Sequence, residues 1–186
     1  MREDWFGLAQ KPVPRYTSYP TAAQFQDAPD RDAVSSWIEG IGADEPISVY
    51  VHVPFCEQLC WYCGCHTTVP NGYARIGRYV DVLLKEMELW KAKLPKHGGG
   101  VHLHFGGGTP NALNPDDMLR VLEALREAFC ITDDAEISIE LDPRTLNPEM
   151  IQAMAAGGVT RASLGVQDFN RTVQEAVNRV QPFLLV

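Results

Sequence analysis

Short apolar runs alternate with amphipathic runs along most of this 186-residue chain, and this alternation constrains the fold more than any other feature. After residue 45, each strand-like run is followed by a helix-like run, an order typical of parallel βαβ units. We therefore predict an α/β fold with parallel strands and about four βα units, preceded by a proline- and tyrosine-rich N-terminal extension over residues 1–45. The predicted strands are Ile47–Val53, Val101–Phe105, Glu136–Leu141 and Arg161–Val166.

The expected helices are recognised by apolar spacing and by their end signals. Between the first two strands, apolar residues recur every three or four positions from Ile76 to Leu94, which places them on one helix face. The next two helices begin at Asn114 and Asn147, where asparagine suits the cap and the following proline suits the first turn. Two more helical runs are expected, near Asp32–Glu39 and from Asn170 onward.

The segments at the ends of these strands carry the most unusual residues of the chain. Parallel strands end at one edge of a sheet, and α/β proteins bind ligands at that edge. We therefore expect these segments to form one site. They are a cysteine loop after Val53, the glycine run Gly106–Gly108, the segment Glu140–Arg144, and Gln167.

The cysteine loop holds four cysteines within ten residues, at Cys56, Cys60, Cys63 and Cys65. Three thiolates at intervals of four and three residues can hold one corner of an iron–sulfur cluster, and a cubane with three cysteine ligands leaves one iron open for a substrate or cofactor. A structural zinc site is less favoured, because its ligands usually form two short pairs far apart. A disulfide framework is also less favoured, because it suits small secreted chains and no secretory signal is evident.

Two cysteines lie outside this three-ligand set. Cys65 has no assigned role, and Cys130, at the end of a helical run, is expected to be a small buried hydrophobe. His102 and His104 share one face of the second strand, and we expect them to pack in the interior and not to bind a metal.

Composition excludes two classes of partner. A net charge of −8 argues against a nucleic-acid-binding surface, which needs clustered Lys and Arg. No apolar stretch reaches the 18 residues that suggest a transmembrane helix. Reduced cysteines without a secretory signal predict a cytoplasmic protein.

The motifs resemble the radical S-adenosylmethionine (SAM) superfamily, whose cluster motif is Cys-x3-Cys-x2-Cys. Within it, the chain is similar to the oxygen-independent coproporphyrinogen III oxidases, a family of haem-biosynthesis enzymes. The resemblance implies a partial radical SAM (β/α) barrel over residues 46–186. It is carried by the segments Arg15–Ala22, Tyr50–Cys56, Cys63–Cys65, Phe105–Pro110, Ser138–Arg144 and Gly165–Asn170.

This resemblance also implies the ligands of the site. It implies a [4Fe–4S] cluster, one or two SAM molecules, coproporphyrinogen III as substrate, and an electron donor and acceptor that the sequence does not identify. The cluster ligands implied are Cys56, Cys60 and Cys63. The residues implied for the cluster-bound SAM are Tyr50, Tyr62, Gly107, Glu140 and Arg179, and those for a second SAM are Gly108, Thr109 and Gln167.

The family is considerably longer than this chain, so we expect an N-terminal part of such an enzyme, whose full-length form is a monomer. Two alternatives stay open. One is a haem-trafficking chaperone related to these enzymes, although such relatives typically carry an aromatic residue in place of Cys65 and lack the segment Tyr16–Pro20. The other is an inert fragment with an exposed strand edge.

Overall fold

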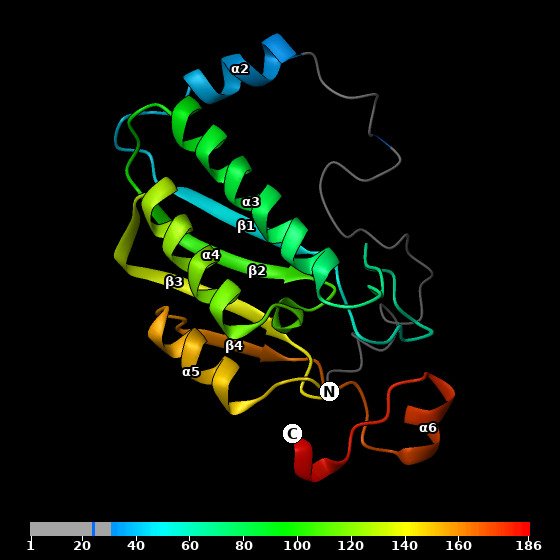
Figure 1. The fold of residues 1–186 in the computed structure, drawn as a ribbon. Coiled ribbons are helices and arrows are strands. Elements are labelled where there is room, and N and C mark those ends of the chain that lie inside the picture. Colours follow the sequence, from blue (N-terminus) through cyan, green and yellow to red (C-terminus); the bar gives the residue numbers. More distant parts are fainter. Residues whose placement is uncertain (1–23, 25–30) are drawn as a thin grey trace, which may run out of the picture. The chain divides into compact units, whose positions relative to one another are not determined.

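The computed structural model describes Gln24 and residues 31–186 (Figure 1). The chain divides into two compact units, Met1–Trp37 and Ile38–Val186. Helix α2 (Arg31–Glu39) confirms the short helix expected near Asp32. Most of the predicted N-terminal extension, including Arg15–Ala22, lies outside the described residues, and its boundary at residue 45 stays a prediction.

The second unit is built on one parallel sheet whose strands follow one another in chain order, β1-β2-β3-β4. Helices α3, α4 and α5 connect successive strands and cover the same face of the sheet (Figure 1). The predicted α/β fold with four parallel strands is therefore confirmed. The strands are β1 (Ile47–Val53), β2 (Gly100–Gly107), β3 (Ile131–Leu141) and β4 (Arg161–Leu164), and the helices are α3 (Ala74–Lys93), α4 (Pro115–Ala128), α5 (Pro148–Ala156) and α6 (Arg171–Ala176), with short 3-10 turns η2 (Pro110–Ala112) and η3 (Phe183–Leu185).

Side chains alternate between the two faces of the sheet, as the pleat of a strand requires. Val53, Phe105 and Ile139 point to the helix side and have no exposed surface, so they form the centre of the core. The opposite face is polar and carries His104 and Glu140, which contact each other. His102 and His104 share this face, as predicted, but His102 is exposed and His104 only partly buried, so the expected interior packing is not seen.

The observed strand ends differ from the predicted ones in three strands. Strand β2 begins at Gly100, one residue before the predicted start, and ends at Gly107, two residues after the predicted end. Strand β3 begins at Ile131, five residues before the predicted start, because Ile131 pairs with Gly100 on β2 despite the acidic pair that follows it. Strand β4 ends at Leu164, two residues early. There the Gly165 amide donates to the Leu141 carbonyl (3.0 Å), and the chain turns away from the sheet.

Cys130 is exposed, so the prediction of a buried hydrophobe was wrong. Its φ of +47° places it in the left-handed region, between the end of α4 and the start of β3. The residue reverses the chain there, and its side chain lies outside the core.

The caps of α4 and α5 confirm the helix starts predicted from the Asn-Pro pairs. The side chain of Asn114 accepts a hydrogen bond from the Asp117 amide (2.7 Å), and that of Asn147 accepts one from the Met150 amide (2.8 Å). Asn114→Ala is therefore expected to lower the free energy of unfolding by about 1 kcal/mol. Urea titration followed by circular dichroism measures the change. Asn114→Asp keeps the acceptor and should remain near the parent, so an equal loss in both variants would contradict the cap assignment.

Within the part of the chain that the structure describes, no helix is long and apolar enough to cross a membrane.

Candidate functional site

A cavity of about 390 Å³ lies at the carboxyl ends of the strands and gathers nearly all of the predicted site residues. Its size falls within the range of small-molecule sites. Tyr50 is the exception, because it lines a separate cavity between β1 and α3. The predicted residues that line the 390 Å³ cavity are Cys56, Cys60, Tyr62, Cys63, Gly107, Gly108, Thr109, Glu140, Gln167 and Arg179, together with Cys65.

The cysteine loop is closed at its base by backbone bonds to Thr68. The Cys56 amide donates to the Thr68 carbonyl (3.1 Å), and the Thr68 amide donates to the Pro54 carbonyl (3.0 Å). Thr67 donates its hydroxyl to Cys56 Sγ (3.3 Å). This closure presents the thiols of the loop to the cavity, and all of them are free.

At two cysteines of the loop, Cys56 and Cys65, the surroundings raise the pKa of the thiol and favour its neutral form. Burial raises the pKa of the Cys56 thiol. The Thr67 hydrogen bond partly offsets this effect, and the negative charges of Cys63 and Asp142 raise the pKa further. Burial and the neighbouring Cys63 likewise raise the pKa of Cys65. Metal binding to thiolates releases protons, so a positively charged group at this site would offset the repulsion among the sulfurs.

Glycines at the end of β2 let this strand approach β1 closely. Gly107 has a φ of +115°, and a Cβ there would lie 2.6 Å from the Val53 carbonyl oxygen. A Cβ at Gly108 would overlap the carbonyl oxygen of Phe55 and the hydroxyl of Thr67. Backbone packing alone therefore requires glycine at both positions. The cofactor contacts predicted for Gly107 and Gly108 stay predictions.

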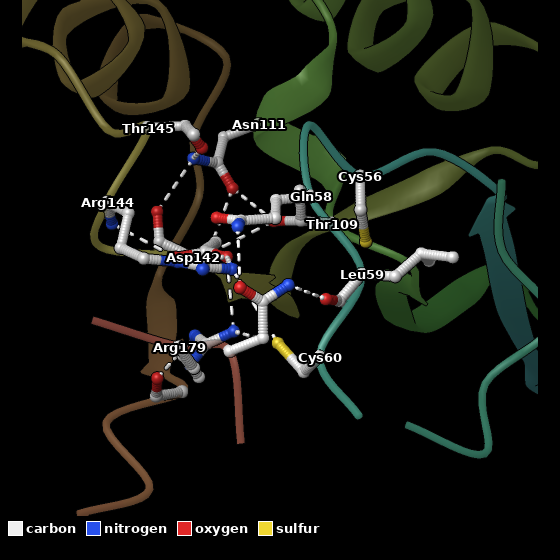
Figure 2. A network of polar contacts seen from close by, with 12 residues as sticks. Cys56, Gln58, Leu59, Cys60, Thr109, Asn111, Asp142, Arg144, Thr145 and Arg179 are labelled. Carbon is white, nitrogen blue, oxygen red and sulfur yellow. Dashed lines mark hydrogen bonds and ion pairs between the residues drawn. The ribbon is translucent and has the colours of Figure 1, made fainter. Parts of the chain in front are cut away.

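A buried polar frame fixes the backbone of Asp142 beside the cavity (Figure 2). The Asp142 amide donates to both Thr109 Oγ1 and Asn111 Oδ1 (3.0 Å each). Asn111 Nδ2 donates to the Asp142 carbonyl (3.0 Å) and to Thr145 Oγ1 (2.8 Å). The hydroxyl of Thr109 is thus engaged within the protein, and it holds the loop that follows β3.

Two arginines converge on the carboxylate of Asp142. Arg144 Nη2 lies 2.6 Å and Arg179 Nη1 lies 3.2 Å from Asp142 Oδ2. Burial opposes ionisation of Asp142, but the hydrogen bonds from Arg144 and the charge of Arg179 hold its pKa below the usual range. Sequence reasoning had assigned Arg179 and missed Asp142 and Arg144, although both belong to the segment Glu140–Arg144 that it had singled out.

Tyr50 lies beside Glu140 on the polar face of the sheet. Its ring stacks on His104 at a centroid distance of 5.7 Å, and its hydroxyl is 3.1 Å from His52 Nδ1. His104 bridges Ser138 Oγ (2.7 Å) and Glu140 Oε1 (3.3 Å). Burial, followed by the charge of Glu140, raises the pKa of Tyr50. Tyr50 is therefore close to the predicted site through Glu140, without lining the cavity.

Two further predicted residues flank the cavity with distinct properties. Gln167 is in the left-handed region with a φ of +65°, an uncommon backbone state for a residue with a side chain. Tyr62 stands in the cysteine loop, and burial, followed by the charge of Cys60, raises its pKa to about 12. Its phenol therefore stays protonated at neutral pH and can donate a hydrogen bond.

Residues 50–184 match the family model of the radical SAM superfamily. The chain belongs to the radical SAM superfamily. It is 44% identical over 171 residues to the oxygen-independent coproporphyrinogen III oxidase of Bradyrhizobium diazoefficiens, and 42% identical over 184 residues to that of Escherichia coli. These alignments cover 92% and 96% of this chain but only 38% and 39% of the relatives.

A solved structure extends this similarity to the fold. The coproporphyrinogen III oxidase of Escherichia coli superposes with a TM-score of 0.85 at 39% identity, over 91% of this chain and 39% of that enzyme. The radical SAM fold predicted from the motifs is confirmed for this part of the barrel. The chain thus spans about two fifths of the length of these relatives.

The radical SAM superfamily implies a [4Fe–4S] cluster and SAM, and the residues at the cavity fit both groups. Four thiols from one loop line the cavity, and the donor set predicted among them is Cys56, Cys60 and Cys63. Arg179 is 8% exposed, and among the described residues its Nε has no hydrogen-bond partner, which leaves a donor for an anionic group. Glu140 provides an acceptor at the same cavity.

Proposed function

We propose that this radical SAM chain carries the cluster- and SAM-binding part of an oxygen-independent coproporphyrinogen III oxidase. The main support is the meeting of the three thiols of Cys56, Cys60 and Cys63 with Glu140 and the Gly107–Thr109 turn at one cavity. The similarity to oxidases of this name, at 44% and 42% identity, supports the reaction class. The cytoplasmic location stays a prediction.

The cysteines have one role in this proposal. Cys56, Cys60 and Cys63 would each bind one iron through Sγ, and the fourth iron would remain open for SAM. When bound, the cluster and SAM supply a one-electron reductive cleavage of the sulfonium and the hydrogen-abstracting radical that results. The loop closure at Thr68 would hold the three sulfurs in place for assembly.

The other residues would bind SAM and fix its orientation at the cluster. Glu140 would accept hydrogen bonds from amino or hydroxyl groups, and Arg179 Nε would donate to a carboxylate. Tyr50 would support Glu140 through His104. A second SAM is proposed at Gly108, Thr109 and Gln167. There the Thr109 hydroxyl is already engaged, so backbone groups would make the contacts.

The proposed reaction converts propionate side chains of coproporphyrinogen III to vinyl groups. Each conversion removes one hydrogen atom and one electron from the side chain and releases carbon dioxide. The electron leaves to an acceptor, and a separate donor reduces the cluster. The electron donor and the electron acceptor are both proposed partners, and the sequence does not identify either molecule.

A chimera tests this proposal. The chain replaces the matching segment of the Escherichia coli enzyme, and the reconstituted protein is incubated anaerobically with SAM, a reductant and coproporphyrinogen III. We expect 5′-deoxyadenosine and vinyl-containing porphyrinogen, both measured by chromatography with mass spectrometry. A chimera that assembles the cluster and cleaves SAM without forming vinyl product would contradict the oxidase assignment. Stoichiometric haem binding without SAM cleavage would favour the chaperone alternative.

Glu140→Gln is expected to weaken SAM binding without changing the iron content. Loss of one charge-assisted hydrogen bond corresponds to about 1.5–3 kcal/mol, or about 10- to 150-fold in affinity. Calorimetric titration of the reconstituted chain measures this change. Glu136→Gln is the matched control, because Glu136 lies on the same strand and pairs with Arg161 (3.4 Å). Equal SAM affinities in Glu140→Gln and Glu136→Gln would show that Glu140 does not bind SAM.

A further inference from the structure

We propose that Asp142 holds the guanidinium groups of Arg144 and Arg179 against Cys60 Sγ, and that these N–H donors raise the reduction potential of the cluster. Arg179 Nη1 lies 3.4 Å and Arg144 Nη2 lies 3.7 Å from Cys60 Sγ. The inference rests on the proposed cluster site and assigns to Asp142 and Arg144 a role that the binding of SAM does not require.

The geometry of the two arginines is fixed by the protein. Arg144 donates to both carboxylate oxygens of Asp142, with Nε 3.0 Å from Oδ1 and Nη2 2.6 Å from Oδ2. Arg179 Nη2 donates to the Gly165 carbonyl (2.6 Å). The side chains of Asp142, Arg144 and Arg179 are only 8%, 13% and 9% exposed. Little solvent therefore screens the charges, and few alternative rotamers compete with this arrangement.

The backbone on both sides of Cys60 is also held against the segment that carries Arg179. Residues 177 and 178 hydrogen-bond to three residues that flank Cys60 in the cysteine loop. The proximity of Arg179 to Cys60 is therefore supported by several independent contacts (Figure 2). These are the bonds from the Trp61 amide to the Val177 carbonyl (3.0 Å), from Gln58 Nε2 to Asn178 Oδ1 (2.8 Å) and from Asn178 Nδ2 to the Leu59 carbonyl (2.8 Å).

The cysteine ligands differ in their hydrogen-bond donors. Cys60 receives two cationic donors, whereas Cys56 receives the neutral hydroxyl of Thr67. Hydrogen bonds to cluster sulfurs are among the factors that set the potential of an iron–sulfur centre. Reduction adds one negative charge to the cluster, and nearby guanidinium groups stabilise that charge. Removing either donor should therefore make the midpoint potential more negative.

Anaerobic spectroelectrochemistry on the reconstituted chain tests the inference. We expect Arg144→Gln and Arg179→Gln to retain about four irons per chain and to show midpoint potentials more negative than the parent, with altered electron paramagnetic resonance of the reduced cluster. Arg144→Lys keeps the charge but loses the planar fork, so its potential should lie between those of the parent and Arg144→Gln. Arg161→Gln removes an equal charge from β4 and should match the parent.

Unchanged potentials in both glutamine variants at full iron content would overturn the inference. Loss of the cluster in every Arg144 variant would also overturn it, because Arg144 would then be needed to build the loop and not to tune the cluster. Failure of the parent chain itself to assemble a cluster would instead contradict the proposed function. Normal assembly with unmoved potentials rejects the tuning role alone.

Discussion

Replacing Cys56, Cys60 or Cys63 with alanine is expected to abolish the iron–sulfur cluster, whereas Cys65→Ala should retain it. Each of the first three would supply one of three cubane ligands, and two thiolates cannot hold the cluster in an open loop. Anaerobic reconstitution with iron and sulfide, followed by iron, sulfide and visible-absorbance measurements, gives the result. The parent and Cys65→Ala should each contain about four irons per chain.

Cys65 makes this experiment a real test of the ligand set. Its thiol lines the same cavity, and burial followed by the neighbouring Cys63 raises the pKa of Cys65. Cys65 is therefore the alternative candidate for the third ligand in place of Cys63. Equal loss of cluster in Cys65→Ala and Cys63→Ala would show that the chosen set of three is wrong. Cys130→Ala is the control for loss of a cysteine outside the site, because that thiol lies in the exposed turn between α4 and β3.

The arrangement of the sheet could be predicted because it depends on local patterns. Strand β1 begins and ends at the predicted residues, and the Asn-Pro pairs mark the starts of α4 and α5. The early start of β3 could not be predicted, because its first residues include Asp133 and Asp134, which read as a turn. They lie in an irregularity of the β2–β3 pairing, between the pairs Gly100–Ile131 and His102–Glu136, and their side chains stay exposed.

The residues that line the cavity could be predicted, but the buried hydrogen-bond network that holds them could not. Residues at the ends of parallel strands had to meet at one edge, which brought the cysteine loop, the glycine run and Glu140 together. The roles of Asn111 and Asp142 depend on burial and on partners from distant parts of the chain. A sequence shows a charged or amide side chain but not its burial, and such a residue is most often exposed.

Gly107→Ala is expected to lower the free energy of unfolding by at least about 3 kcal/mol, because backbone strain and overpacking act together. The φ of Gly107 is +115°, and an added Cβ would lie within 2.6–3.0 Å of three backbone atoms of Val53. Val53 pairs with Gly107 across β1 and β2, so neither strand can move away without loss of pairing. Urea unfolding followed by circular dichroism measures the difference.

Two other glycines separate the effects of strain and of contact. Gly72 has a φ of +80° but open space around a Cβ, so Gly72→Ala should cost only the strain, about 1–2 kcal/mol. Gly64, within the cysteine loop, also has open space and no left-handed φ, so Gly64→Ala should be near neutral. If Gly107→Ala destabilises the chain no more than Gly72→Ala does, close packing against Val53 is not what requires glycine. The positive φ of Gly107 would then account for the whole cost, as it does at Gly72.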